Sequence, residues 1–222
     1  MDKIIMIGGK GSAVVIAEQI YDTQVKAGNV EFLGYAFDDE SFGGEINGFP
    51  VLCKTYEAYK KYAKYGDVKF LYQIYRPDLM EERIQLLKSY QIPHCKFATF
   101  IHHSAYVANS VVLGHGNVIL SNVIINSNAV IGNFNTIHSN SLIGHDTVLE
   151  DYNFVAAHNV IGSNSRIGNG NFFGINSSVN NYITMGNYNF LGMASNLVKS
   201  LGSQNKVYGN PAQNFEKRIK PL

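Results

Sequence analysis

Large apolar residues recur at every sixth position of this chain from Ile101 onward. The residues at this position are Ile101, Val107, Leu113, Ile119, Ile125, Ile131, Ile137, Ile143, Leu149, Val155, Ile161, Ile167, Phe173, Val179, Met185, Leu191 and Leu197. A strict period of six fits neither the 3.6-residue period of an amphipathic helix nor the alternation of a simple strand. It is typical of a parallel β-helix, in which each short strand turns one apolar side chain inward before the chain bends. Three such hexads, about 18 residues, would complete one triangular coil.

The other positions of the hexads indicate how the corners are built. Glycine often follows the apolar residue, and most asparagines of the chain lie between residues 101 and 200. Both residue types tolerate left-handed backbone conformations, which sharp corners require. The fifth position is usually small or polar, which fits a cramped inner corner. Because a disordered asparagine-rich tract would lack the regular apolar position, we predict an ordered β-helix.

The first hundred residues have a different pattern. An apolar run at residues 3–7 leads into a glycine-rich turn and then a helical pattern from Val14 to about Ala27. A buried strand, a tight turn and a helix are the opening of a βαβ unit. Pro77 suits the first turn of a later helix. Further strands are expected at 31–37, 49–52 and 68–75, and helices at 56–65 and 77–90. This alternation predicts a small doubly wound, Rossmann-like α/β domain.

Two segments of this α/β region could bind a nucleotide. The glycine-rich turn places backbone N–H groups at a helix N-terminus, where a phosphate can bind. An acidic pair follows the second strand, where carboxylates commonly accept hydrogen bonds from a ribose or a base. Val14 stands where a dinucleotide fingerprint needs its third glycine, so a tight turn that binds no ligand is an alternative for the first segment. A solvated turn is the alternative for the acidic pair. The candidate residues are Gly9, Lys10, Gly11, Ser12, Ala13, Asp38 and Asp39.

Charge changes abruptly near residue 100. Between residues 101 and 198 the ionised side chains are Asp146, Glu150, Asp151 and Arg166, whereas the first hundred residues carry most of the others. This shift predicts two domains, residues 1–100 and 101–222. A formal net charge of +1 argues against nucleic acid or an acidic membrane as the main partner.

The sequence also predicts a compartment. Cys53 and Cys95 are two lone cysteines without metal-type spacing, which suits a reducing cytoplasm. The residues after Met1 have no signal-peptide pattern, and no apolar run reaches the ~18 residues of a membrane span. We therefore expect a soluble cytoplasmic protein with no membrane partner.

The arrangement of motifs resembles the bacterial sugar O- and N-acyltransferases of the NeuD/PglD type, over nearly the whole chain. The matching segments are Ile7–Gly11, Phe37–Asp39, Ile46–Leu52, Phe97–Ala105, Ile143–Asp146 and Tyr208–Ala212. The resemblance implies a left-handed parallel β-helix after the α/β domain, assembled as a homotrimer. It further implies that acetyl-CoA, as co-substrate, lies in the groove between neighbouring β-helices. The α/β domain would hold the nucleotide of a nucleotide-linked amino sugar.

The resemblance also assigns roles to residues. His145 would be the general base and Asp146 the acidic neighbour that raises its basicity. The positions that match the family's CoA contacts are Phe154, Gly174, Ile175 and Met193.

The sequence departs from the family's pattern in two places. Ser12 and Ala13 replace the His and second Gly of the family's Gly-His-Gly loop, and Phe154 replaces a second histidine near the acetyl thioester. His158 is the substitute that the sequence offers for that histidine.

The remaining histidines do not predict a metal site. A catalytic zinc on this fold would need three convergent imidazoles. No such spacing is found among His102, His115, His138, His145 and His158. His115 and His145 are 30 residues apart, which is not a whole number of 18-residue coils, so they should lie on different faces of the β-helix. We therefore expect no metal.

The sequence thus predicts an acetyl-CoA-dependent N-acetyltransferase. Its substrate would be a nucleotide-linked amino sugar, with a 4-amino-4,6-dideoxy sugar favoured, for surface polysaccharide (lipopolysaccharide or O-antigen) or glycan synthesis. One alternative is O-acetylation of a sialic-type sugar. The other is a non-catalytic nucleotide-sugar-binding protein built on the same frame.

Overall fold

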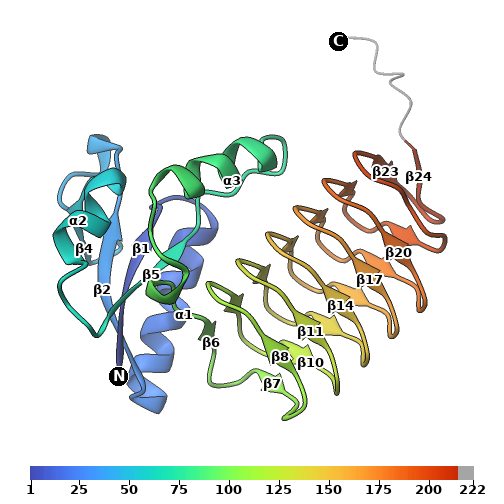
Figure 1. Ribbon diagram of the computed structural model, residues 1–222, viewed down its shortest axis with the longest axis horizontal. Helices are drawn as coiled ribbons and strands as arrows, with labels where there is room; N and C mark the ends of the chain where they lie inside the picture. The colour runs from blue at the N-terminus through green and yellow to red at the C-terminus, as the bar shows by residue number, and fades with distance from the viewer. Residues whose placement is uncertain (215–222) are drawn as a thin grey trace, which may run out of the picture.

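A computed structural model of the chain describes residues 1–214. An α/β part built around one sheet comes first, and a β-helix whose coils stack away from it follows (Figure 1). The predicted fold class is confirmed. The end of the predicted tail, residues 215–222, lies outside the described residues. Among the described residues, no helix has the length and apolarity needed to cross a membrane.

The α/β part contains a five-stranded sheet with the strand order β3-β4-β2-β1-β5. Its strands are β1 (Asp2–Ile7), β2 (Val30–Ala36), β3 (Glu45–Ile46), β4 (Phe49–Cys53) and β5 (Val68–Tyr72). The strands β1, β2, β4 and β5 are parallel, and only β3 runs antiparallel to its neighbour. The helices are α1 (Ser12–Ala27), α2 (Ala58–Tyr62) and α3 (Met80–Ser89), with 3₁₀ turns η1 (Glu40–Phe42), η2 (Thr55–Glu57) and η3 (His94–Lys96).

Three predicted elements differ clearly from the observed ones, and the first is β5, which ends at Tyr72 and not at residue 75. The segment predicted as one helix at 56–65 divides into η2 and the short α2. The helix expected to begin at Pro77 begins at Met80 instead. The reason is a turn that precedes it: the Arg76 guanidinium donates two hydrogen bonds to the Asp78 carboxylate, and the Leu79 N–H donates to the Arg76 carbonyl.

The β-helix consists of three flat sheets that are parallel except for the last strand of the third. Up to Leu197 their strands recur every 18 residues, as Ile125 opposite Ile143 and Ile131 opposite Leu149 illustrate. The first sheet contains β7 (Tyr106–Val107), β10 (Ile124–Ile125), β13 (Leu142–Ile143), β16 (Val160–Ile161), β19 (Ser178–Val179) and β22 (Asn196–Leu197). The second contains β8 (Val112–Leu113), β11 (Val130–Ile131), β14 (Val148–Leu149), β17 (Arg166–Ile167) and β20 (Thr184–Met185). The third contains β6 (Phe100–Ile101), β9 (Val118–Ile119), β12 (Thr136–Ile137), β15 (Phe154–Val155), β18 (Phe172–Phe173), β21 (Phe190–Leu191), β23 (Lys206–Tyr208) and β24 (Gln213–Asn214).

The hexad residues from Ile119 to Leu197 form one continuous buried core. Asparagines stack beside it in a buried ladder at one corner of the coils. The side-chain oxygen of Asn117 accepts hydrogen bonds from the backbone N–H and the side-chain amide of Asn135, and the same pairing recurs one coil further on. The ladder satisfies buried polar groups that would otherwise be left without partners. It accounts for part of the asparagine enrichment.

The left-handed residues of the corners lie at the fourth hexad position, not at the glycine-rich second position. Asn128, Asn164 and Asp146 have φ values of 61°, 58° and 55° there. The second-position glycines have another purpose, because a Cβ at Gly144 would approach the backbone N of Ser163 on the next coil to 2.5 Å. The prediction that these glycines supply the left-handed corners was therefore wrong: they let the coils stack closely.

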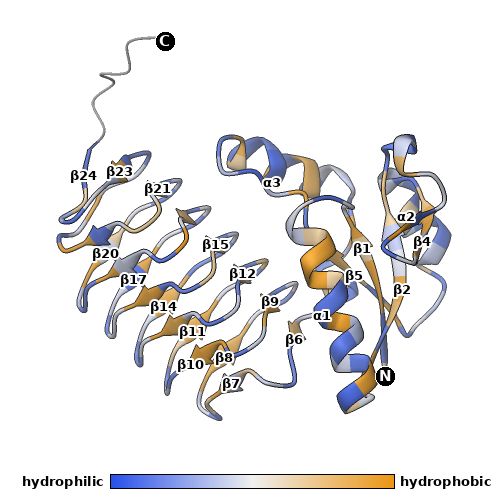
Figure 2. Ribbon diagram, turned by 180° about the vertical axis from the view of Figure 1, so that it is seen from behind, coloured by the Kyte–Doolittle hydropathy of each residue, from blue (hydrophilic) through white to orange (hydrophobic). Residues whose placement is uncertain are grey.

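The two parts of the chain share a core. Val118 and Leu120, on the first coils, pack with Ile16 and Ile20 of α1 and with Phe100. Helix α1 lies between the sheet and the β-helix in both ribbon views, with its apolar residues coloured orange in Figure 2. The predicted division of the chain into two domains near residue 100 therefore stays a prediction.

Candidate functional site

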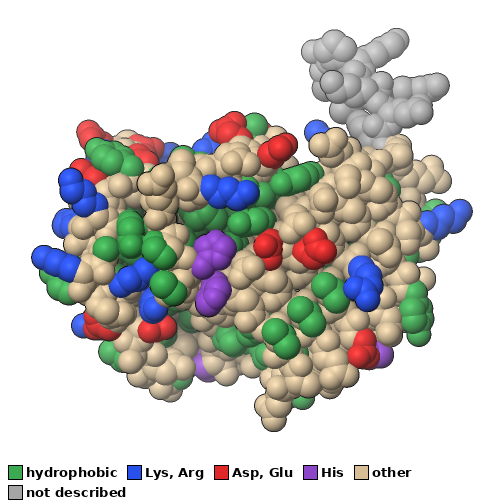
Figure 3. Space-filling model, in the orientation of Figure 1, with side chains coloured by type: hydrophobic (Ala, Val, Ile, Leu, Met, Phe, Trp, Pro, Cys, Tyr) green, Lys and Arg blue, Asp and Glu red, His purple; other side chains and the backbone are tan. Residues whose placement is uncertain are grey.

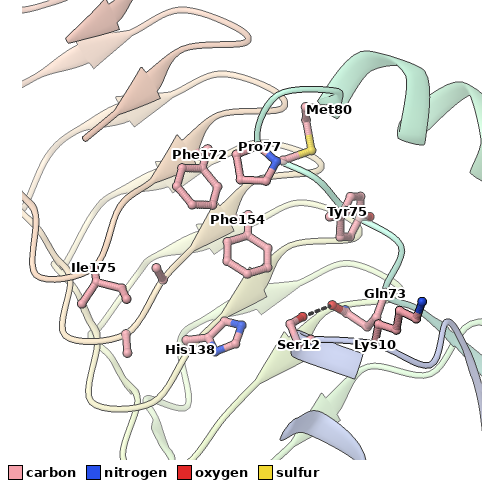
Figure 4. A pocket seen from close by; sticks show the side chains of 13 residues that line it. Lys10, Ser12, Gln73, Tyr75, Pro77, Met80, His138, Phe154, Phe172 and Ile175 are labelled. Atoms are coloured by element: carbon pink, nitrogen blue, oxygen red, sulfur yellow. Dashed lines mark hydrogen bonds between the residues drawn. The ribbon is translucent and has the colours of Figure 1, made fainter. Parts of the chain in front are cut away.

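A cavity of about 470 Å³ lies where the α/β part meets the third sheet of the β-helix (Figure 4). Its lining is mainly apolar on the β-helix side, while the glycine-rich turn closes the other side. The residues are Lys10, Gly11, Ser12, Gln73, Tyr75, Pro77, Met80, His138, Phe154, Ala156, Ala157, Phe172 and Ile175. The cavity therefore brings together the predicted nucleotide turn and two predicted CoA positions, Phe154 and Ile175.

The nucleotide turn has the geometry of an anion site. Gly11 caps helix α1 with φ 54° and ψ −120°, a conformation that suits glycine. Within the described residues, the backbone N–H groups of Gly9, Lys10, Gly11 and Ser12 have no hydrogen-bond acceptor. No acidic side chain lies in the first turn of α1. These free donors and the helix dipole favour a phosphate beside Ser12.

Close packing explains the first glycines of this turn. A Cβ at Gly9 would lie 2.6 Å from the Phe37 ring, and a Cβ at Gly8 would lie 2.8 Å from the Gln73 carbonyl oxygen. Ala13 is fully buried on α1 and faces the protein core. Of the predicted turn residues, Lys10, Gly11 and Ser12 reach the cavity.

The two acidic residues after β2 have different partners. The Asp38 carboxylate accepts hydrogen bonds from the backbone N–H and the hydroxyl of Thr55, at 2.8 and 2.7 Å. Asp39 pairs with the Lys10 ammonium at 2.5 Å, and this hydrogen bond is the main cause that lowers the pKa of Asp39. Neither carboxylate lines the large cavity. Asp39 is linked to it only by its ion pair with Lys10, which does line the cavity.

A row of aromatic rings forms the β-helix wall of the cavity. Phe154 stacks on Phe172, and Phe172 stacks on Phe190, with ring centroids 5.4 and 5.0 Å apart. His138 also lies at this wall, although the hexad pattern did not single it out as functional, and its ring centroid lies 4.9 Å from that of Phe154 (Figure 4). His158, the substitute that the sequence offered, is exposed at a corner and does not line the cavity. A signal for His138 was present, because a histidine occupies a hexad position where glycine is common.

Burial controls the charge of His138. Its Nε2 atom is buried and has no hydrogen-bond partner among residues 1–214, and burial lowers the pKa of the ring to about 4. In the unfolded chain the ring takes up a proton below about pH 6.5. Because the folded ring stays neutral until about pH 4, the unfolded state binds more protons across this window. The free energy of unfolding should then fall as the pH is lowered from 6.5 to 4.

This linkage gives a prediction for His138→Phe, which replaces the ring by one that cannot titrate. Between pH 7 and pH 5, wild type should lose about 2 kcal/mol of unfolding free energy more than the variant. Urea unfolding of both proteins at the two pH values measures the difference. An equal loss in wild type and variant would show that the His138 ring is not held neutral.

The predicted base and its neighbour form a hydrogen-bonded pair. The Nδ1 atom of His145 lies 2.6 Å from Oδ2 of Asp146, and both side chains are about half exposed. Asp146 also accepts a hydrogen bond from the Asn128 side chain. These two bonds, first the one with His145, lower the pKa of Asp146 and keep it ionised. The Nε2 atom of His145 has no partner within the described residues and is open to a substrate.

His145 lies at a different corner from the cavity. His138 precedes β13 and His145 follows it, so a whole side of the coil separates them. His145 is not among the cavity residues. A single chain thus does not bring the base and the nucleotide turn together.

The predicted CoA positions are arranged along one ridge of corners. Ile175 and Met193 are 53% and 70% exposed, so each offers an apolar surface to a ligand or a second chain. Gly174 is different, because a Cβ there would collide with the backbone N of Met193 and lie 2.7 Å from the Gly192 carbonyl carbon. Its lack of a side chain makes room for the next coil.

Comparisons with known proteins agree with this architecture. No family model matches the chain, and no curated protein matches it. Perosamine N-acetyltransferase from Caulobacter crescentus, solved as a histidine-to-asparagine mutant with CoA and GDP-perosamine, has a TM-score of 0.82, 22% identity, and coverage of 98% of both chains. The acetyltransferase domain of PglB from Neisseria gonorrhoeae has a TM-score of 0.81, 20% identity, and coverage of 97% of this chain and 100% of that one.

A third similar structure is WeeI from Acinetobacter baumannii, with a TM-score of 0.64, 20% identity, and coverage of 97% of this chain and 100% of that one. At these identities the likeness establishes the fold. The chain shares the architecture of these structures, an α/β part followed by a left-handed β-helix. The fold that the sequence resemblance implied is confirmed.

Proposed function

We propose that this protein is an N-acetyltransferase that moves the acetyl group of acetyl-CoA to the amino group of a nucleotide-linked amino sugar. The observation that carries the proposal is the His145 imidazole, which Asp146 holds by Nδ1 so that Nε2 is free. The likeness in fold to a protein crystallised with CoA and GDP-perosamine supports it.

The geometry suits general-base catalysis. An amine that attacks a thioester carbonyl must lose a proton as the C–N bond forms. Nε2 of His145 takes that proton, and the proton on Nδ1 stays hydrogen-bonded to Asp146. The negative charge of Asp146 then stabilises the imidazolium. The CoA thiolate leaves as the tetrahedral intermediate collapses, and a backbone N–H of a neighbouring coil is the simplest donor to its oxyanion.

The substrate sites follow from the cavity. The free N–H groups at Lys10, Gly11 and Ser12 bind the diphosphate, and Asp39 faces the nucleoside. The sugar lies against the Phe154 and Phe172 rings, where a 6-deoxy methyl group buries well and an unpaired hydroxyl would not. This favours a 4-amino-4,6-dideoxy sugar. Acetyl-CoA runs along the ridge of Ile175 and Met193.

The separation of the base from the cavity requires a second copy of the chain. In a homotrimer, the corner with His145 and Asp146 on one copy would face the cavity of its neighbour. The β-helix surface supports such packing, since it carries few charged side chains (Figure 3). A trimer in the cytoplasm, acting in surface polysaccharide synthesis, completes the proposal.

Thiol release from acetyl-CoA tests this function. We expect release with UDP-, dTDP- or GDP-linked amino sugars and none with the matching sugars that carry a hydroxyl in place of the amine. Release only with hydroxyl sugars would instead establish O-acetylation. Tight binding of a nucleotide sugar with no release from any of them would establish a binding protein.

A further inference from the structure

The junction between α1 and the first coil carries a second cluster of functional groups, far along the chain from the His145 corner. It consists of Asp22 on α1 and the adjacent His102 and His103, which follow β6. One ligand atom from each residue lies within 4.8 Å of the other two. We propose that these three side chains bind a divalent transition metal ion of the zinc class, which fastens the α/β part to the β-helix.

The distances fit a tetrahedral site. Oδ2 of Asp22 lies 3.2 Å from Nε2 of His102 and 3.6 Å from Nδ1 of His103. Ligands about 2.0–2.1 Å from a tetrahedral zinc ion are separated by about 3.3 Å. The two distances from Asp22 are close to this value, and the two ring nitrogens, which lie within 4.8 Å of each other, would reach it by rotation of the exposed His103 side chain.

The surroundings support His102 as a ligand. Its ring is 5% exposed, and its Nδ1 accepts a hydrogen bond from the Ser104 backbone N–H at 3.2 Å and lies 2.9 Å from the Ser104 hydroxyl oxygen. When Nε2 binds a metal, Nδ1 carries the proton and can donate it to that hydroxyl, an arrangement that orients metal-binding histidines. In the metal-free protein Nε2 faces Asp22 and carries the ring proton, and metal binding at Nε2 moves this proton to Nδ1 with no net release.

The other side of the site is open. The His103 and Asp22 side chains are 27% and 38% exposed, which leaves a fourth position for water. Lys26 is a competing cation, because its ammonium lies 2.8 Å from the other carboxylate oxygen of Asp22. Its side chain is 58% exposed, and surface pairs of this kind are weak, so it can move aside when a dication binds.

The role of the metal follows from the position of its ligands. Asp22 belongs to the helix that covers the sheet, and the two histidines belong to the chain that enters the β-helix. The site is not part of the proposed acetyl transfer. Its loss should change the stability of the protein and leave the acetyl-transfer chemistry unchanged.

Titration of the full chain with ZnCl₂ tests this inference. The protein carries no polyhistidine tag and is first stripped with a chelator. We expect one zinc ion bound per chain, and a Tm higher by roughly 5–10 °C at a zinc concentration 100 times Kd. Co²⁺ in place of Zn²⁺ should give the visible absorption of a tetrahedral site.

Variants separate this site from adventitious zinc. His103→Gln and Asp22→Asn should each weaken zinc binding by at least about tenfold. His158→Asn, which alters an exposed histidine outside the cluster, should bind zinc as wild type does. No bound zinc in wild type, or equal binding by wild type and His103→Gln, would overturn the inference. Neither outcome depends on acetyl transfer, so the proposed function is tested separately.

Discussion

His145→Ala should lower kcat for acetyl transfer by about 10²–10⁴, the usual range for removal of a general base. The amine would then have to pass its proton to water as it attacks the thioester. Both substrates should still bind, because His145 is half exposed and lies outside the cavity that holds the nucleotide turn. Steady-state kinetics with each substrate varied in turn separate kcat from KM.

Two further variants test the assignment of the base. Asp146→Asn keeps a residue type that tolerates the left-handed corner but removes the negative charge, so it should lower kcat by less than His145→Ala does. His138→Phe changes the histidine inside the cavity. If His145→Ala retains a tenth or more of wild-type kcat while His138→Phe does not, the base is His138.

The second large effect concerns stability, in Gly174→Ala. The added methyl group would collide with the backbone of the next coil at Met193 and Gly192, which cannot move without shifting the whole coil. Overpacking of this kind costs about 1–3 kcal/mol, and we expect a value at the upper end because the contact is with backbone atoms. Thermal and denaturant unfolding would measure it.

Gly202→Ala is the matched control. The nearest atom to a Cβ at Gly202 is the Asn205 side-chain nitrogen, 3.9 Å away. This substitution should change the free energy of unfolding by less than about 0.5 kcal/mol. Equal effects of the two alanines would show that glycine at the second hexad position is not required for stacking.

The β-helix was predictable from sequence because its signal is repeated. Each inward residue from Ile119 to Leu197 has the same environment, so the period is clear even where the residue type changes, as at Phe173. The start of α3 was not predictable, because the turn before it depends on contacts of Arg76 with Asp78 and Leu79. Local contacts of this kind leave no periodic signal.

The site was predictable only in part. The pairing of His145 with Asp146 was implied by the family resemblance, and the structure contains it. The place of His138 does not follow, since it depends on which sheet of the β-helix faces the α/β part. The same holds for Asp22, which meets His102 and His103 only because α1 packs against the first coil.

The central claim is that the nucleotide turn of one copy and the His145–Asp146 pair of another form a single acetyl-transfer site. Co-expression of His145→Ala with Ser12→Trp, which fills the cavity of the turn, tests it most directly. Each variant alone should be inactive. In randomly mixed oligomers, about a quarter of the sites would combine an intact turn with an intact histidine from the neighbouring copy. We predict recovery of about a quarter of wild-type kcat per site in the purified mixed oligomer. Activity no higher than that of the separate variants would contradict the shared site.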